Sequence, residues 1–243
     1  MKILSKPRNG TNLIEVNQYG FGYIPVPKVA CTSFKFCIAK IIDFQVGEGS
    51  IHKELETTRI KSRDDFKDLF IFTFVRNPFE RILSAFTNKI KPKRNIKANH
   101  LENGVHKALV VYYGDSFYGG MSFKQYVKNV YEIPDSHSDA HFKSQYSILH
   151  STDGNPLYDF VGKLENLEAD IEKLNKILKK PLQDIPVKNK TNGKKKHYSL
   201  YYDDEMVDLM TKRYSNDLNF FDYSYQNMNP DKFIDPFEDY YKT

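Results

Sequence analysis

Apolar residues in this chain occur both as continuous runs and as repeats with helical spacing. Residues 19–26 are rich in residues that favour strands and end before Pro27, and residues 69–75 form an unbroken apolar run of the kind that is buried on both faces of a sheet. A segment that predicts a helix follows each run: residues 32–44 are apolar on nearly all sides, as in a buried helix, and residues 79–90 also predict a helix. Two successive strand, loop and helix units predict an α/β fold with a central parallel sheet flanked by helices.

The rest of the chain predicts three more helices and a third strand. Apolar spacing indicates helices at 122–131, 165–179 and 203–214, and residues 157–161 are compatible with a strand. Residues 45–67, residues 135–151 and the chain after Phe220 are polar enough to predict loops. The sequence has no internal repeat and no clear linker, so we expect a single domain over residues 1–243.

Composition places the chain among globular proteins. Hydrophobic residues make up 40% of the 243 residues, which is enough to fill a sizeable core. The longest apolar stretches, at 69–75 and 108–113, are far shorter than the roughly 20 residues of a membrane-spanning helix, and the first residues show no signal-peptide pattern. Cys31 and Cys37 have the spacing of neither a metal clip nor a disulfide framework.

Basic residues are concentrated in two segments. The net charge is +5, yet ten bases lie in two runs without acids, so the rest of the chain is acidic on balance. Such focused charge favours an anionic ligand, although lysine runs are often only solvated loops. The first run contains Lys89, Lys91, Lys93, Arg94 and Lys97, and the second contains Lys188, Lys190, Lys194, Lys195 and Lys196.

The loop between the first predicted strand and helix has the chemistry of an anion site. Successive backbone N–H groups, the hydroxyls of Thr32 and Ser33 and the charge of Lys28 can all face an oxyanion there. The alternative is that a hydroxyl only caps the helix and that Lys28 is an exposed loop residue. The loop is neither a Walker A motif nor a dinucleotide-binding fingerprint, and the HExxH and GxSxG motifs are absent from the sequence.

The second strand, loop and helix unit, FVRNPFERILSAF at 74–86, offers a second anion site. Arg76 lies where the strand is expected to end, and Ser84 lies two helical turns into the following helix, so a guanidinium and a hydroxyl could converge on a phosphate. Glu80 and Arg81 could simply pair with each other on the surface. The two loops together predict a ligand with two anionic ends.

These two motifs resemble those of sulfotransferases that use 3'-phosphoadenosine 5'-phosphosulfate, in particular the carbohydrate branch. PKVACTSFK is similar to that family's 5'-phosphosulfate loop, and FVRNPFERILSAF is similar to its 3'-phosphate motif. Similar patterns occur at 158–167 and around Tyr214, Asp217 and residues 221–223, so the resemblance covers most of the chain. It implies a P-loop-like α/β fold and no catalytic metal.

The resemblance also implies which residues bind the donor. Arg76 and Ser84 would hold the 3'-phosphate, and Lys190 and Thr191 would complete the nucleotide site. The 5'-phosphosulfate would be held by the loop residues Lys28, Val29, Ala30, Cys31, Thr32 and Ser33.

Transfer by in-line displacement needs a cation at the leaving 5'-phosphate oxygen and a base for the acceptor hydroxyl. Lys28 is the predicted cation. His52 is the predicted base, because it lies 24 residues before Arg76, about where related glycan sulfotransferases place a catalytic histidine. His141 is the alternative, because its loop resembles the family's acceptor segment.

The resemblance implies a carbohydrate or glycolipid acceptor, adenosine 3',5'-bisphosphate as the nucleotide product, and no nucleic-acid partner. Many animal members have a membrane anchor in the Golgi, and this sequence shows none, so we expect a cytoplasmic enzyme, or a Golgi-lumen enzyme if the chain is trimmed. Two other functions stay open. They are a P-loop kinase-like phosphotransferase, which would need Mg²⁺, and a basic nucleic-acid-binding module.

Overall fold

The computed structural model describes residues 3–7, 10–47, 50–90, 101, 104–183, 185, 196–228, 234 and 236–237. Contacts divide the chain into two compact units, and each is considered by itself. The sheet unit comprises Gly10–Arg76 and Gln145–Gly193, and the helical unit comprises Met1–Asn9, Asn77–Ser144 and Lys194–Thr243. The expectation of one domain over residues 1–243 stays a prediction.

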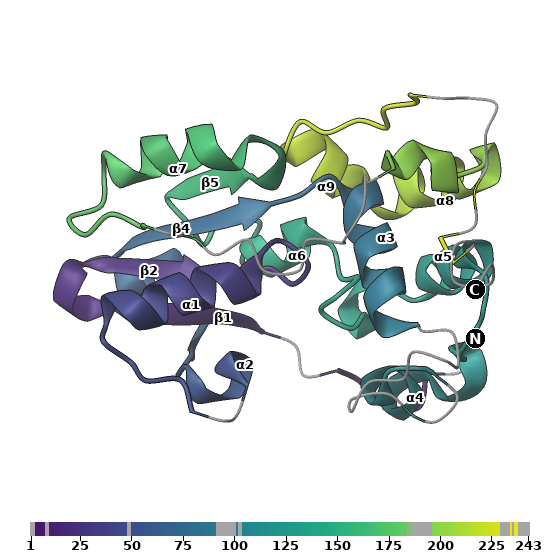
Figure 1. Cartoon of the computed structure of the whole chain (residues 1–243), viewed down its shortest axis with the longest axis horizontal. Coiled ribbons are helices and arrows are strands. Elements are labelled where there is room, and N and C mark those ends of the chain that lie inside the picture. Colours follow the sequence, from purple (N-terminus) through teal and green to yellow (C-terminus); the bar gives the residue numbers. More distant parts are fainter. Residues whose placement is uncertain are drawn as a thin grey trace. The chain divides into compact units, whose positions relative to one another are not determined.

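The sheet unit is built on a five-stranded sheet with the order β3-β1-β2-β4-β5 (Figure 1). Neighbours β2, β4 and β5 are parallel, which confirms the predicted α/β fold, whereas β1 is antiparallel to both β2 and β3. The predictions missed β1, and β3 lies in a segment predicted as a loop because two of its three side chains are exposed. The strands are β1 (Thr11–Val16), β2 (Phe21–Ile24), β3 (Thr58–Ile60), β4 (Phe70–Val75) and β5 (Phe160–Lys163).

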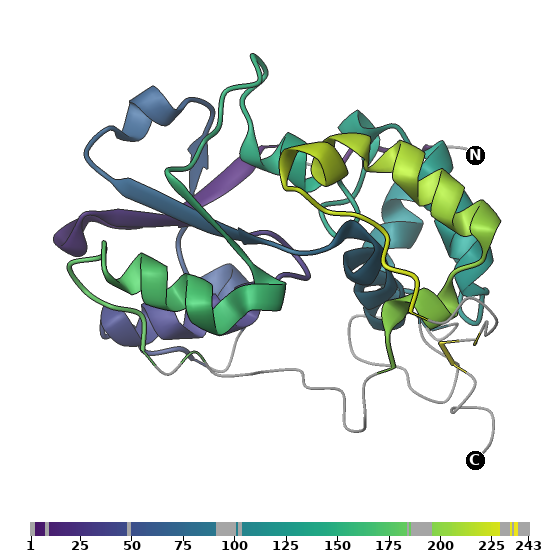
Figure 2. The same cartoon turned by 90° about the horizontal axis from the view of Figure 1, so that it is seen from above.

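Helices and short turns cover both faces of this sheet. Helices α1 (Cys31–Ile41) and α7 (Leu167–Asn175) lie on one face, and the 3-10 turn Arg63–Phe66 and the loop at 151–155 lie on the other (Figure 2). Both helices confirm predicted ones. The short helices α2 (Ile51–Glu54) and α6 (Gln145–Leu149) lie in segments predicted as loops, because four or five residues are too few to show a helical repeat.

Aromatic packing fixes α1 on the sheet. The ring of Phe34 lies 5.2 Å from that of Tyr23 and 4.7 Å from that of Phe74, centroid to centroid. Phe74 in turn occupies the space above Gly162 of β5, where an added Cβ would approach the ring within 2.3 Å. This packing holds the first turn of α1 at the edge of the sheet where β2 and β4 end.

In the part of the helical unit that the structure describes, five α-helices pack around a core of apolar and aromatic side chains. Side chains of Asn77, Ser122 and Asp203 accept hydrogen bonds from backbone N–H groups and thereby cap α3, α5 and α8. These three helices were predicted, whereas α4 and α9 were not. The helices are α3 (Pro78–Lys89), α4 (Lys107–Tyr113), α5 (Phe123–Glu132), α8 (Asp204–Arg213) and α9 (Ser215–Phe220).

No helix within the described residues has both the length and the apolar character needed to cross a membrane. Most of both lysine runs lies outside the described residues, which include only Lys89 of the first and Lys196 of the second. The predicted role of these runs therefore stays a prediction.

Candidate active site

The loop that joins β2 to α1 has an uncommon backbone conformation. Lys28 and Ala30 have φ angles of 71° and 49°, in the left-handed region that residues with a Cβ avoid at a cost of roughly 1–2 kcal/mol each. Alternation of left-handed and ordinary residues turns successive N–H groups toward one side and forms an anion-binding concavity. Strained backbone of this kind is typical of ligand-binding loops.

The first turn of α1 follows this loop and adds N–H groups to it. Ala30 is the N-cap residue and has no side-chain oxygen to cap the helix. The first N–H groups of any α-helix have no carbonyl partner within the helix, and they favour negative charge. Ser33 is buried and Thr32 is half-buried in this turn. The N–H of Val29, by contrast, donates to the carbonyl of Val26 at 3.3 Å.

Arg76 lies at the same edge of the sheet, directly after β4. Its side chain is only 8% exposed, and Nη1 donates to the Lys28 carbonyl oxygen at 3.1 Å. The two parallel strands β2 and β4 therefore bring Lys28 and Arg76 to neighbouring positions at one edge of the sheet.

A buried glutamine that sequence reasoning missed holds the backbone of Arg76. Gln145 is 0% exposed, and its Oε1 accepts from the Arg76 N–H at 2.9 Å while its Nε2 donates to the Arg76 carbonyl at 2.8 Å. The amide therefore satisfies both backbone groups of Arg76, as a neighbouring strand would. No periodicity or motif marks such a contact in the sequence.

We expect Gln145→Met to lower the free energy of unfolding by about 1–3 kcal/mol, because it leaves the buried N–H and carbonyl of Arg76 unpaired. Urea unfolding measures this change. Gln125→Met is the matched control at an exposed glutamine, and it should change stability by less than about 0.5 kcal/mol. Equal effects of the two changes would contradict a stabilising role for the two hydrogen bonds between Gln145 and the backbone of Arg76.

His52 lies beside the loop in the sheet unit. It is exposed on α2, and its Nε2 is 3.0 Å from Oγ1 of Thr32, within hydrogen-bond distance. The side chain of Ser50 caps this short helix by accepting from the His52 N–H. The structure therefore brings one predicted base, His52, to the predicted phosphosulfate loop.

His141 lies in the helical unit and pairs with a carboxylate. Its Nδ1 is 2.5 Å from Oδ1 of Asp139, which also accepts from the His141 N–H. Burial alone would raise the pKa of Asp139, but the charge and hydrogen bonds of His141 outweigh burial and hold that pKa well below its usual range.

Buried side chains hold the loop that carries His141. Arg81 is only 1% exposed and donates to the carbonyls of Ala140 and Lys143, and the Tyr214 hydroxyl donates to the Phe142 carbonyl. The suggestion of a surface pair between Arg81 and Glu80 is therefore wrong, because the guanidinium of Arg81 points into the unit and binds backbone carbonyls.

The remaining predicted donor residues are not joined to the loop by the structure. Ser84 is half-buried on α3 in the helical unit, so its pairing with Arg76 stays a prediction. Lys190 and Thr191 lie outside the described residues. Cys31 opens α1 beside Ala30 and is half-buried with a free thiol.

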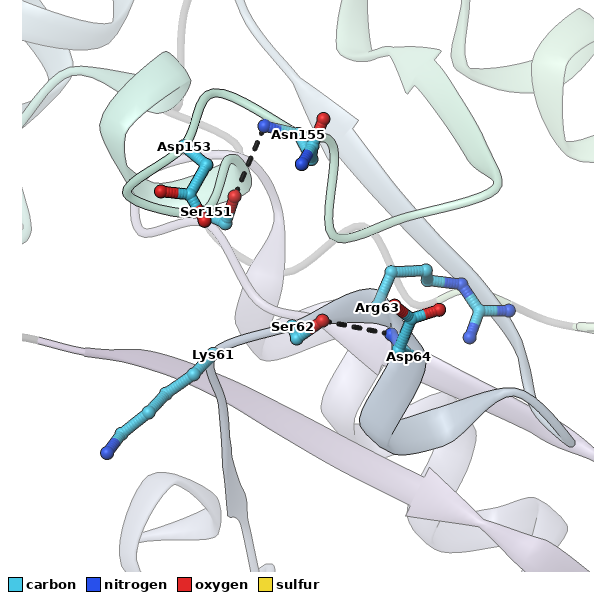
Figure 3. A pocket seen from close by; sticks show the side chains of 7 residues that line it. All are labelled: Lys61, Ser62, Arg63, Asp64, Ser151, Asp153 and Asn155. Atoms are coloured by element: carbon cyan, nitrogen blue, oxygen red, sulfur yellow. Dashed lines mark hydrogen bonds between the residues drawn. The ribbon is translucent and has the colours of Figure 1, made fainter.

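A polar pocket of about 240 Å³ in the sheet unit contains none of the predicted site residues. Arg63, one of its lining residues, pairs with Asp159 and donates to the Leu69 carbonyl, so the pocket lies where β4 and β5 begin and not where they end. Figure 3 shows the Lys61 side chain extending away from the pocket's carboxylates. The lining residues are Lys61, Ser62, Arg63, Asp64, Ser151, Asp153 and Asn155. Within the described ranges, no group of three or more His, Cys, Asp or Glu side chains is placed to hold a metal ion.

Comparison with known proteins gives one family. The model of the sulfotransferase family matches residues 12–224. That match includes both predicted phosphate motifs and both predicted bases. No solved structure matches the chain.

Several carbohydrate sulfotransferases are similar to this chain over part of their length. Carbohydrate sulfotransferase 12 from Mus musculus is 25% identical over 210 residues, which cover 69% of this chain and 48% of the relative. Carbohydrate sulfotransferase 11 from Rattus norvegicus is 27% identical over 190 residues, or 68% and 52%. Carbohydrate sulfotransferase 14 from Homo sapiens is 25% identical over 181 residues, or 70% and 47%. The chain thus spans about half the length of the curated relatives it matches.

Proposed function

The chain belongs to the sulfotransferase family, and from this premise we propose that it transfers a sulfuryl group from 3'-phosphoadenosine 5'-phosphosulfate to a hydroxyl of a carbohydrate or glycolipid. The carbohydrate comes from the relatives' names, which are all those of carbohydrate sulfotransferases. The observation that supports the proposal best is the loop at Lys28 and Ala30, whose strained backbone, uncapped helix start and neighbouring Arg76 suit a doubly anionic nucleotide.

In the proposed reaction, the acceptor oxygen forms a bond to sulfur while the bond between sulfur and the 5'-phosphate oxygen breaks. The N–H groups at the start of α1 and the ammonium of Lys28 stabilise the charge on the leaving phosphate oxygen. The acceptor proton goes to His52, whose Nε2 lies at the loop. The products are a sulfate ester and adenosine 3',5'-bisphosphate.

His141 takes a different part in this proposal. Its Nδ1 is engaged by Asp139, and its loop is fixed by Arg81 and Tyr214, so it presents a rigid polar group. We assign it to acceptor binding. His141→Ala should therefore raise the KM for the acceptor more than it lowers kcat.

Two measurements test the function. Calorimetry should show that adenosine 3',5'-bisphosphate binds without Mg²⁺, and an acceptor screen with the phosphosulfate donor should show mass gain of one sulfuryl group on a carbohydrate. A requirement for Mg²⁺ would favour the kinase-like alternative. Failure to bind the bisphosphate together with salt-dependent binding of DNA would favour the nucleic-acid module.

Arg76→Ala should weaken binding of adenosine 3',5'-bisphosphate by roughly 10- to 100-fold, because a guanidinium can make two charge-assisted hydrogen bonds to the 3'-phosphate. Adenosine 5'-monophosphate, which lacks that phosphate, should lose much less. Calorimetry with both nucleotides gives the two losses.

Arg76 also donates to the Lys28 carbonyl, so it could act only by supporting the loop. In that case both nucleotides would weaken equally. Such an outcome would remove Arg76 from the 3'-phosphate site. Arg76→Lys is the control that keeps the charge but loses the planar fork.

A further inference from the structure

The polar pocket where β4 and β5 begin is a cavity that the proposed reaction does not use. Its volume of about 240 Å³ lies below the roughly 300–1,000 Å³ of pockets that enclose drug-sized ligands. It therefore suits one small polar unit and not a whole nucleotide. The donor loop and Arg76 lie at the other end of the same strands.

One wall of the pocket is a tight loop that is fixed by its own hydrogen bonds. The Ser151 N–H donates to the Asn155 carbonyl at 2.8 Å, and the Gly154 N–H donates to the Ser151 carbonyl at 3.0 Å. The Ser151 hydroxyl accepts from the Asn155 N–H at 3.2 Å. Gly154 has a φ angle of 82°, which favours a residue without a Cβ. The loop thus presents the side chains of Asp153 and Asn155 to the pocket from an ordered backbone.

The opposite wall is the 3-10 turn Arg63–Phe66 together with the residues before it. The Ser62 hydroxyl caps this turn by accepting from the Asp64 N–H at 3.2 Å. Arg63 donates to the two carboxylate oxygens of Asp159 at 3.0 and 2.6 Å, so contacts within the protein fix its guanidinium. Both walls are therefore formed before any ligand binds, which lowers the entropy that binding costs.

Two side chains of the first wall carry hydrogen-bonding groups that the protein leaves unused. Among the residues that the structure describes, neither the carboxylate of Asp153 nor the side-chain amide of Asn155 has a hydrogen-bond or ion-pair partner. A carboxylate accepts hydrogen bonds, and an amide both donates and accepts them. A sugar matches this combination, because each of its hydroxyl groups can donate one hydrogen bond and accept others.

The charges of the pocket also favour an uncharged polar ligand. Asp64 and Asp153 repel a phosphate or a sulfate, and Figure 3 shows that the Lys61 side chain extends away from these carboxylates. Arg63 adds positive charge to the lining, which disfavours a metal cation. A neutral sugar ring carries neither penalty.

We propose that this pocket is a second carbohydrate subsite, which binds one neutral sugar unit of the acceptor away from the hydroxyl that receives the sulfuryl group. The inference rests on the proposed function for the identity of the ligand. The six residues of β4 separate the pocket from Arg76, or about 20 Å at roughly 3.3 Å per residue. One sugar unit cannot occupy both places. The pocket therefore selects acceptors that are oligosaccharides, because a second contact on the same chain raises its affinity.

Acceptors of different length test the subsite. We expect the double change Asp153→Ala and Asn155→Ala to raise the KM for an oligosaccharide acceptor by at least roughly 10-fold, because it removes the hydrogen bonds to the distant sugar unit. The kcat, the KM for a fragment with a single sugar unit and the affinity for adenosine 3',5'-bisphosphate should not change. Thr152→Ala is the matched control, since Thr152 is exposed in the same loop and does not line the pocket. An unchanged thermal unfolding midpoint verifies that the double variant folds.

An array of immobilised oligosaccharides measures binding without transfer, and the wild type should bind them more tightly than the double variant. Equal binding by the two proteins, or no binding by the wild type, would overturn the subsite whether or not transfer occurs. A midpoint that Ca²⁺ raises in the wild type but not in Asp153→Ala would also overturn it, by assigning the pocket to a cation. A wild type that binds oligosaccharides through the pocket but transfers no sulfuryl group in the acceptor screen would refute the proposed function and leave the subsite standing.

Discussion

Replacing Lys28 with glycine should lower kcat for sulfuryl transfer by at least roughly 10²-fold while the protein stays folded. The ammonium is the proposed charge at the leaving 5'-phosphate oxygen, where negative charge develops in the transition state. Glycine suits the test better than alanine, because the φ angle of 71° at this position favours a residue without a Cβ. Loss of rate in Lys28→Gly therefore reports the missing ammonium and not backbone strain.

Steady-state rates for the wild type, Lys28→Gly and Lys28→Ala, with circular dichroism to verify folding, provide the measurement. Lys28→Arg should retain part of the rate, since it keeps a positive charge in a different shape. Turnover at the wild-type rate in the folded glycine variant would exclude Lys28 from the chemical step.

His52→Ala should lower kcat by at least roughly 10²-fold and leave the affinity for adenosine 3',5'-bisphosphate intact, because a general base acts on the acceptor proton. Discontinuous assays at saturating donor and varied acceptor give kcat, and calorimetry gives the affinity for adenosine 3',5'-bisphosphate. Only an unprotonated imidazole can accept a proton, so wild-type kcat/KM should decline toward acid pH, and the variant should lose this dependence.

Thr32→Val tests whether the rate depends on the imidazole of His52 itself or on its hydrogen bond to Thr32. It removes the hydroxyl that lies 3.0 Å from Nε2 and keeps the imidazole, so a large residual rate is expected relative to His52→Ala. His141→Ala is the second control. If it loses the rate and the acid limb of the pH profile while His52→Ala keeps them, the assigned roles of the two histidines are reversed.

The fold class followed from the sequence, because β2 and β4 lie in continuous apolar or strand-favouring runs and each is followed by a segment that predicts a helix. The misses have physical reasons. Strand β3 has three residues at the sheet edge, and α2 and α6 are shorter than the repeat that identifies a helix. Such elements form because tertiary contacts select them, and those contacts are not visible in local spacing.

The candidate site was predictable where it depends on residue type and not where it depends on three-dimensional contacts. Lys28 and Arg76 follow strands, so their shared edge could be inferred from a parallel sheet. The hydrogen bonds of Gln145 to the Arg76 backbone and the burial of Arg81 could not be inferred, because both depend on hydrogen bonds between a side chain and the backbone of a distant segment. A lysine such as Lys35 reads as a surface residue until its burial is known.

The hydrogen bonds between Gln145 and Arg76 also indicate how the sheet unit could be produced as a shorter chain. The chain leaves this unit after Arg76 and returns to it at Gln145, and the two residues are hydrogen-bonded to each other. Residues 77–144 are thus an insertion whose two ends enter and leave at neighbouring points, as in proteins that accept inserted or permuted segments. A short glycine-rich linker between residues 76 and 145 would span this gap, and a chain limited to residues 10–193 and joined in this way would carry all five strands without the segments of the helical unit, for separate study of nucleotide binding.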